Sequence, residues 1–183
     1  VTKYNEFLRS GNPSRLEREE IDFLLDYGLK TVIDLRNDRE LEKEKSAFKD
    51  IPSINYQHIS MFDDNMRRGD EPRFEDLGKL YVRAIESAQS FGRIFNTMAD
   101  NADGVILFNC TAGKDRTGLT AALLLMLAGV DDTDIIANYQ VSFTYFKGSY
   151  EKTLEVHPDM PMHFAKSEAE WIENIINMIN RDY

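Results

Sequence analysis

Cysteine is almost absent from this chain of 183 residues, which contains one, Cys110. A single cysteine cannot form an internal disulfide, and no second thiol of the chain could protect Cys110 after oxidation. Histidine is also scarce, and the three that occur, His58, His157 and His163, show no ligand spacing with carboxylates or with the cysteine. We therefore expect a core that is stable without disulfides, no bound metal and no cofactor.

An excess of positive charge and long apolar runs are missing as well. The chain has 22 basic and 32 acidic residues, a net charge of −10, which argues against a nucleic-acid partner and against simple docking on anionic lipid. No apolar run approaches the roughly 18 residues of a membrane-spanning helix. A negatively charged substrate would have to be attracted by local donors and cations, against the field of the whole molecule. The sequence leaves the oligomeric state open.

Apolar segments, in contrast, recur regularly along the chain. The length fits a single domain over residues 1–183, and the segments predict the α/β class, with a central, mainly parallel sheet flanked by helices. The expected strands are Thr31–Leu35, Ile54–Met61 and 104–108. The expected helices run from a capping box at Ser14 and Glu17 to Gly28, over 77–98, 119–128 and 133–146, and over 167–179 behind a second capping box at Ser167 and Glu170. Between them we expect an exposed charged stretch, 37–49, and a polar loop, 63–73.

Ten residues, Asn109 to Gly118, join the third expected strand to the helix that follows it and read Asn-Cys-Thr-Ala-Gly-Lys-Asp-Arg-Thr-Gly. A strand–loop–helix turn of this kind aims several backbone N–H groups and the positive end of a helix at one point. Cys110 stands at the start of the turn, and Arg116 follows six positions later. A thiolate and a guanidinium that face such a group of amides form a site for a phosphoryl group.

Each residue type in this loop suits phosphoryl chemistry. The helix N-terminus and nearby cations favour the thiolate form of the cysteine, which is the nucleophile, while the arginine can grip two phosphate oxygens. Thr117 could cap the first helical turn or help the sulfur to leave when a phosphocysteine is hydrolysed. Gly118 is expected to let the helix approach the ligand or the sheet closely. The residues expected to hold the phosphate are Thr111, Ala112, Gly113, Lys114, Asp115 and Arg116.

The motif Cys-x5-Arg-Thr-Gly that begins at Cys110 resembles the signature loop of the cysteine-dependent protein tyrosine phosphatases. Its version Cys-x-Ala-Gly-Lys-Asp-Arg-Thr-Gly is similar to a bacterial branch of that family, and residues 8–11 and 31–36 with Glu40 agree with the same branch. The resemblance implies a protein tyrosine phosphatase-like fold and a metal-independent phosphomonoesterase that forms a phosphocysteine intermediate. It also implies phosphotyrosine protein as substrate, with phosphoserine, phosphothreonine or a phosphoinositide as further substrates.

One residue departs from the family pattern. The position before the cysteine is commonly histidine, and here it is Asn109, whose amide forms hydrogen bonds but carries no charge. We expect a less stabilised thiolate than in relatives with histidine, and lower activity around pH 6. The departure also leaves open a catalytically weak phosphate-binding module. A rhodanese-type sulfurtransferase, which uses a loop cysteine too, is a further alternative, although Asp115 and the Arg-Thr-Gly tripeptide fit phosphoryl transfer better.

The general acid that protonates the leaving oxygen is not fixed by the sequence. Asp115 lies inside the loop, and the resemblance implies an acid role for it in the bacterial branch. Its alternative role is to brace the loop by accepting amide hydrogen bonds. Asp63 and Asp64 follow the expected strand 54–61, where related enzymes often carry the acid on a loop. Their alternative is a solvated surface turn.

Two further features bear on the substrate and the location of the protein. Lys114 adds a second cation to the loop, which suits highly charged esters such as phosphoinositides, and its alternative is a surface lysine without a role. Asp34 and Arg36 are expected to be buried and paired near the strand ends, with a structural role. A reactive thiol needs reducing conditions, which favours the cytoplasm, although a secreted protein stays open because an export signal could have preceded Val1.

Overall fold

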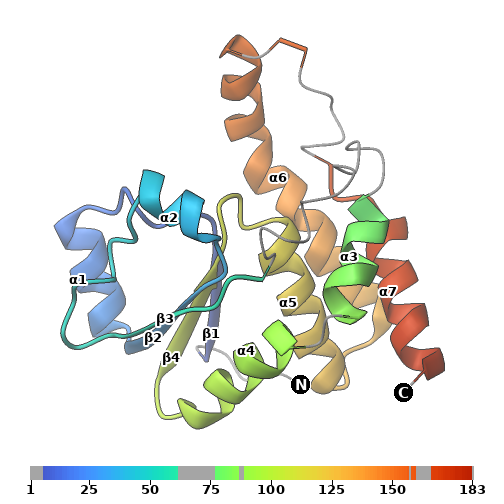
Figure 1. The fold of residues 1–183 in the computed structure, drawn as a ribbon, viewed down its shortest axis with the longest axis horizontal. Helices are drawn as coiled ribbons and strands as arrows, with labels where there is room; N and C mark the ends of the chain where they lie inside the picture. The colour runs from blue at the N-terminus through green and yellow to red at the C-terminus, as the bar shows by residue number, and fades with distance from the viewer. Residues whose placement is uncertain (1–5, 62–76, 87–88, 157, 160–165, 183) are drawn as a thin grey trace.

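A computed structural model describes residues 6–61, 77–86, 89–156, 158–159 and 166–182, and Figure 1 shows them as a ribbon. Its strands are β1 (Phe7–Ser10), β2 (Leu29–Asp34), β3 (Asn55–His58) and β4 (Val105–Asn109). Its helices are α1 (Arg18–Asp26), α2 (Asp38–Lys43), α3 (Leu77–Glu86), α4 (Gln89–Asp100), α5 (Asp115–Leu127), α6 (Asp132–Val156) and α7 (Ala169–Asp182).

The four strands form one sheet in the order β1-β4-β2-β3, and every neighbouring pair is parallel. The predicted α/β class with a mainly parallel sheet is therefore confirmed. β4 lies between β1 and β2, which explains why all five of its residues are buried and why its sequence is continuously apolar up to Asn109. The carboxyl ends of parallel strands share one edge of a sheet, so the residues that follow β1, β2 and β4 meet there.

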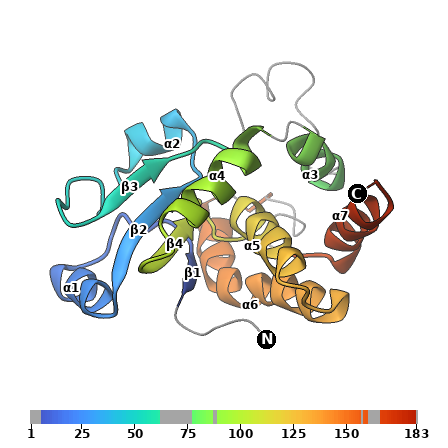
Figure 2. The same ribbon diagram turned by 90° about the horizontal axis from the view of Figure 1, so that it is seen from below.

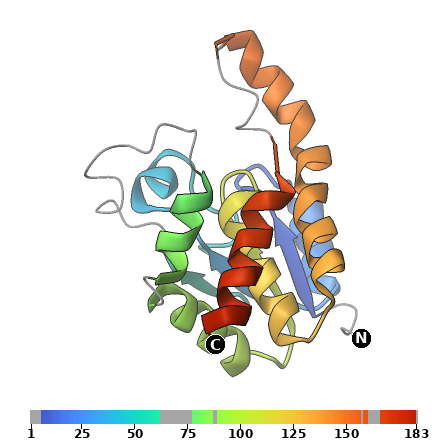
Figure 3. The same ribbon diagram turned by 90° about the vertical axis from the view of Figure 1, so that its right-hand side faces the viewer.

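Helices cover both faces of this sheet (Figures 1 and 2). On one face, α1 packs through Leu24 against a core that includes Val32 of β2 and Leu107 of β4. On the other face, α4 and α5 contribute Ile94 and Leu119 to a larger core that also includes residues of α3, α6 and α7. Because successive side chains of a strand point to opposite faces, alternate residues of β4 belong to these two cores. Figure 3 shows that the C-terminal part of α6 projects away from the other elements.

The first helix begins later than predicted. α1 starts at Arg18, and its capping interaction joins Glu17 and Glu20, whose carboxylate accepts a hydrogen bond of 2.9 Å from the Glu17 N–H. The prediction of a capping box at Ser14 is wrong, because the Ser14 N–H donates to the side chain of Asn12 in a turn before the helix. The helix ends before Gly28, whose φ of 101° explains the glycine at that position.

The second predicted capping box is also wrong. α7 starts at Ala169, and the Ser167 hydroxyl is buried without a hydrogen-bond partner among the described residues. The carbonyl of the preceding residue, Lys166, accepts a hydrogen bond of 2.8 Å from Lys114. The helix otherwise covers the predicted stretch and buries Ile172, Ile175 and Ile176.

Other element boundaries differ as well. The stretch 37–49, predicted to be exposed, contains the helix α2. Asn37 caps this helix by accepting a hydrogen bond of 2.9 Å from the Glu40 N–H. Phe48, in the same stretch, is buried in the core on the α1 side of the sheet. The single helix predicted over 77–98 is described as α3 and α4, with 87–88 outside the described residues. β1 was not predicted as a strand, since its four residues are too few to show a periodicity. The predicted loop 63–73 also lies outside the described residues.

Candidate active site

The loop between β4 and α5 turns sharply at Gly113, whose φ is 68°. A Cβ atom at this position would lie 2.7 Å from the backbone N of Gly11 and 2.8 Å from the carbonyl O of Ser10, so a side chain does not fit. The Asn12 N–H donates a hydrogen bond of 3.0 Å to the carbonyl of Thr111. The segment that follows β1 therefore packs directly on the loop and fixes its shape.

Cys110 lies at the end of β4 and is 2% exposed. The first backbone hydrogen bond of α5 runs from the Gly118 N–H to the carbonyl of Lys114. The N–H groups of residues 115–117 precede this bond and have no acceptor within the helix. Together with the helix dipole they favour an anion at the N-terminus of α5. Thr117 belongs to this first turn rather than to a capping position, and its hydroxyl is buried without a hydrogen-bond partner among the described residues.

Glu40 holds the guanidinium of Arg116 in a bidentate ion pair. The Nη1 atom lies 2.6 Å from Oε2, and the Nη2 atom lies 2.7 Å from Oε1. The hydroxyl of Thr111 also donates to the Glu40 carboxylate. Burial alone would raise the pKa of Glu40, but the hydrogen bonds and charge of Arg116, with the Thr111 hydroxyl, lower it to about 2. The pKa of Arg116 is raised by the same pair, against the effect of burial.

A second arginine, Arg9 of β1, holds the loop from the other side. Its guanidinium donates to the carbonyl of Gly113 at 3.2 Å and to α6 through the side chains of Asn138, at 2.7 Å, and Ser142, at 2.5 Å. Burial lowers the pKa of Arg9, and the charge of Cys110 acts in the opposite direction. The sequence predicts no role for Arg9 beyond its place in the stretch 8–11 that resembles the bacterial branch.

Lys114 is 2% exposed, so its interpretation as a surface lysine is wrong. Its Nζ atom lies 2.9 Å from Asp115 Oδ1, donates to the carbonyl of Lys166 at 2.8 Å, and stands 5.6 Å from the ring centroid of Trp171. These contacts attach the loop to the start of α7. Among the described residues, the ammonium group is therefore engaged by the protein itself.

Asp115, the first residue of α5, keeps 27% of its side chain exposed. Its Oδ1 atom accepts a hydrogen bond of 2.5 Å from the hydroxyl of Tyr81 and pairs with Lys114. Its contacts among the described residues are thus with side chains rather than with the amides that the bracing hypothesis required. The competing candidates, Asp63 and Asp64, lie outside the described residues.

A buried ion pair supports the loop from below. Arg36 and Asp34 are 1% and 0% exposed, and two contacts, Nε to Oδ1 at 2.9 Å and Nη2 to Oδ2 at 2.7 Å, join them as predicted. The Tyr56 hydroxyl donates to Asp34 at 3.0 Å, and Arg36 donates to the side chain of Asn12 at 2.7 Å. Because the Asn12 backbone bonds the loop, this pair positions the loop indirectly.

Asn109 is fully buried at the end of β4, paired in register with Ser10 on one side and Asp34 on the other. By the alternation along β4 its side chain shares the α1 side of the sheet with Leu107, away from the side of Cys110. Neither polar atom of its amide has a hydrogen-bond partner among the described residues. The residue that replaces the common histidine therefore lies on the α1 side of the sheet, next to Asp34 in the register, and not on the side of Cys110.

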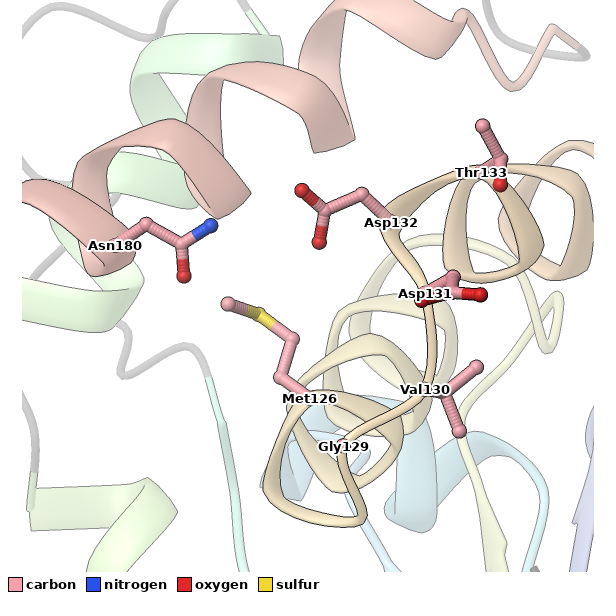
Figure 4. A pocket seen from close by; sticks show the side chains of 7 residues that line it. All are labelled: Met126, Gly129, Val130, Asp131, Asp132, Thr133 and Asn180. Carbon is pink, nitrogen blue, oxygen red and sulfur yellow. The ribbon is translucent and has the colours of Figure 1, made fainter. Parts of the chain in front are cut away.

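Away from this loop the described residues offer little for catalysis. A hollow of about 400 Å³ lies at the opposite end of α5, where the side chains of Asp132, Met126 and Asn180 approach one another (Figure 4). Its acidic lining does not suit a phosphate ester. The described residues contain no group of three or more histidine, cysteine or acidic residues that could hold a metal ion, and no helix among them is long and apolar enough to cross a membrane.

A parallel sheet that carries a cysteine loop at a helix N-terminus, with an arginine fixed beside it, has the donors and the charge that suit an anion such as a phosphoryl group. The sequence profile of the family described as "Tyrosine phosphatase family" matches residues 1–183. The chain therefore belongs to the tyrosine phosphatase family.

Two bacterial relatives agree with this membership. The chain is 36% identical over 148 residues to a protein of Nostoc commune named tyrosine-protein phosphatase, with 78% of this chain and 50% of the relative covered. It is 32% identical over 142 residues to a putative tyrosine-protein phosphatase of Cupriavidus necator, with 72% and 50% covered. The chain thus spans about half the length of the curated relatives it matches.

The solved structures that it resembles are more distant. Superposition on P. aeruginosa TpbA gives a TM-score of 0.43 at 18% identity, over 74% of this chain and 68% of that chain. The human tyrosine phosphatase-like serine/threonine/tyrosine-interacting protein gives a TM-score of 0.41 at 16% identity, over 81% and 97%.

Proposed function

We propose that this chain is a single phosphatase domain that hydrolyses phosphomonoesters through a phosphocysteine on Cys110, with phosphotyrosine protein as its main substrate. The observation that carries the proposal is the loop itself, in which Cys110 lies close before the first turn of α5 and Arg116 lies within that turn, so that the thiol, the guanidinium and the positive end of the helix belong to one short segment. Membership of the tyrosine phosphatase family supports the same chemistry and favours it over the sulfurtransferase alternative.

The loop residues then have distinct roles. The Cys110 thiolate attacks phosphorus, a sulfur–phosphorus bond forms, and the bond from phosphorus to the leaving oxygen breaks. The amides of the loop and the guanidinium of Arg116 stabilise the equatorial oxygens, and the buried pair with Glu40 keeps this guanidinium in place. An acid delivers a proton to the leaving oxygen. Water then attacks phosphorus and returns a proton to the carboxylate of the acid, the sulfur–phosphorus bond breaks, and the Thr117 hydroxyl stabilises the departing thiolate.

We assign the acid to Asp115 rather than to Asp63 or Asp64. Asp115 lies next to Arg116 in the chain, keeps part of its carboxyl exposed, and is held by two donors on one oxygen. A carboxyl fixed beside the phosphate site meets the geometric requirement for general acid catalysis. The contacts of Asp115 thus support an acid role.

The surroundings of Lys114 bear on the substrate class. The ammonium group is bound by Asp115, by a carbonyl and by an indole ring, so it is poorly placed to read a second phosphate. We therefore rank phosphotyrosine peptides above phosphoinositides, with phosphoserine and phosphothreonine peptides between them.

Phosphate release tests the proposed function. Wild type and Cys110→Ser are compared, without added metal, on a phosphotyrosine peptide, a phosphoserine peptide and a phosphoinositide. We expect turnover that is fastest on the phosphotyrosine peptide and is abolished by Cys110→Ser. Binding of the peptides without turnover by the wild type would instead support the phosphate-binding module, for which Asn109 in place of the common histidine is the supporting observation.

A further inference from the structure

Two buried hydroxyl groups and the partly exposed carboxyl group of Asp115 form a row of hydrogen bonds behind the loop. The hydroxyls of Tyr139 and Tyr81 lie 2.8 Å apart, and the Tyr81 hydroxyl lies 2.5 Å from Asp115 Oδ1. Tyr81 and Tyr139 are 0% and 1% exposed. Tyr81 comes from α3, Tyr139 from α6 and Asp115 from α5, so these hydrogen bonds join three helices at one point.

The chemistry of the groups fixes the direction of these hydrogen bonds. A carboxylate only accepts, so Tyr81 donates its proton to Asp115, and its oxygen then accepts from Tyr139. Burial and the charge of Asp115 raise the pKa values of both phenols, which keeps both protons on the tyrosines. The Tyr81 hydroxyl, held by Tyr139, therefore acts as a fixed hydrogen-bond donor to Asp115.

A second donor reaches the same carboxylate oxygen. Lys114 Nζ lies 2.9 Å from Asp115 Oδ1, the atom that already accepts from Tyr81. A proton on Oδ1 would face an ammonium and a hydroxyl that both point hydrogens at it. The acidic proton of a neutral Asp115 consequently belongs on Oδ2. Among the described residues, the contacts of Asp115 all fall on Oδ1.

We propose that Tyr81 is a positioning residue for general acid catalysis, which holds Asp115 through Oδ1 so that the proton for the leaving group is carried by Oδ2. Tyr81 also stabilises the carboxylate that remains after the proton has moved to the leaving oxygen. This role rests on the proposed function and on Asp115 as its acid.

The packing of the two tyrosines keeps the donor in place. A Cβ atom at Gly118 would lie 3.0 Å from the ring of Tyr139, so the glycine allows that ring to lie against the first turn of α5. This close approach is to α6, whereas the side chain of Arg9 from the sheet would lie 3.8 Å away, at an ordinary contact distance. The ring of Tyr81 packs edge-on against Tyr139 and Trp171, with centroid distances of 6.3 and 6.5 Å.

The experiment compares two leaving groups in one protein sample. Phenyl phosphate releases a poor leaving group that needs a proton, whereas dinitrophenyl phosphate releases a stable anion that does not. We expect Tyr81→Phe to lower kcat on phenyl phosphate about tenfold or more and on dinitrophenyl phosphate less than about threefold, because general acid catalysis contributes roughly 10²–10⁴-fold. The ratio of the two rates does not depend on the fraction of folded protein.

Two further variants make the test specific. Tyr139→Phe, a matched loss of one hydroxyl that leaves the contact with Asp115 in place, is expected to change the ratio less than Tyr81→Phe does. Asp115→Asn is expected to lower kcat on phenyl phosphate more than kcat on dinitrophenyl phosphate, as Tyr81→Phe does. The double variant is expected to lose no more kcat on phenyl phosphate than Asp115→Asn alone.

Equal losses on both substrates in Tyr81→Phe, or multiplicative losses in the double variant, would overturn the positioning role alone. An unchanged ratio in Asp115→Asn would also overturn it, because another group would then be the acid. If the wild-type protein shows no turnover, or if its turnover does not depend on Cys110, the proposed function is overturned and this inference with it.

Discussion

Glu40 and Arg116 lie 76 positions apart in the chain and meet through two parallel hydrogen bonds of 2.6 and 2.7 Å. Glu40 stands on α2, which follows β2, and Arg116 lies in the first turn of α5, which follows β4. Their meeting depends on β2 and β4 being neighbours in the sheet. The pair fixes the arginine before any substrate arrives, which reduces the reorganisation needed during catalysis.

Loss of this carboxylate should impair catalysis. We expect Glu40→Gln to lower kcat about 10- to 100-fold, because a bidentate charged pair worth roughly 1.5–3 kcal/mol is replaced by weaker neutral contacts. The control is Glu42→Gln, which removes an exposed carboxylate from the same helix. Steady-state rates on a phosphotyrosine peptide measure both variants. A loss below about threefold in Glu40→Gln would contradict a role for the pair in holding Arg116.

The same carboxylate should make the stability of the protein depend on pH. The pKa of Glu40 falls from 4.5 to about 2 on folding, so its contribution is fully present above pH 4.5 and is lost as the pH falls toward 2. The difference in unfolding free energy between wild type and Glu40→Gln should therefore narrow between pH 5 and pH 2. Urea unfolding at a series of pH values in this range measures it. A difference in unfolding free energy that stays constant over this pH range would show that the ion pair with Arg116 does not lower the pKa of Glu40.

Two glycines with the same backbone conformation allow a matched test of the loop. Gly113 and Gly129 have φ values of 68° and 69°, but a Cβ would clash only at Gly113, since nothing lies within 4 Å of it at Gly129. The positive φ alone should cost alanine about 1 kcal/mol of stability at either position, and at Gly113 the contact with the backbone of Ser10 and Gly11 adds to this cost. We expect Gly113→Ala to lose most of its phosphatase activity as well, whereas Gly129→Ala retains it. Similar activity in the two variants would contradict the close packing of Gly113 on the β1 segment.

The buried pair beneath the loop should contribute more to stability than a surface pair. Asp34→Asn leaves the guanidinium of Arg36 buried without its countercharge, and we expect a loss of about 3–5 kcal/mol in unfolding free energy. The control is Asp103→Asn, which removes the exposed partner of Lys30 and should change stability little. Denaturant unfolding compares them. Equal effects of the two substitutions would contradict a structural role for Asp34.

The departure at Asn109 leads to a prediction about activity. Histidine at this position would add a group that becomes a cation near pH 6, one residue from the thiolate and beside Asp34. We expect Asn109→His to raise kcat/KM at pH 6 relative to pH 8, with Asn109→Gln as the neutral control. Identical pH profiles for the three proteins would contradict an electrostatic effect of this position.

The local arrangement of the candidate site could be predicted from the sequence. Cys110, Gly113 and Arg116 stand within one short segment between an apolar strand and an apolar helix, and the structure places this segment between β4 and α5 as predicted, whereas phosphate binding there stays a prediction. The buried pair of Asp34 and Arg36 was also predicted, because both residues stand at the end of a strand.

The supporting contacts could not be predicted, since they depend on how distant elements meet. Arg9, Tyr81 and Trp171 reach the loop from β1, α3 and α7, and no periodicity or spacing in the sequence relates them to it. Burial of Lys114 was missed for the same reason, because a lysine is expected at the surface unless its partners are known. The capping box expected at Ser14 failed because Asn12 binds the Ser14 N–H in a turn of its own.

The most direct test of the account is to trap the covalent intermediate. Wild type, Cys110→Ser and Asp115→Asn are mixed with a phosphotyrosine peptide, quenched in acid within a single turnover and digested, and the peptide containing residue 110 is examined by mass spectrometry. We predict one phosphoryl group on Cys110 in the wild type and none in Cys110→Ser. Rapid release of phosphate with no phosphoryl group on Cys110 at any time point, or release by Cys110→Ser at the wild-type rate, would contradict the account.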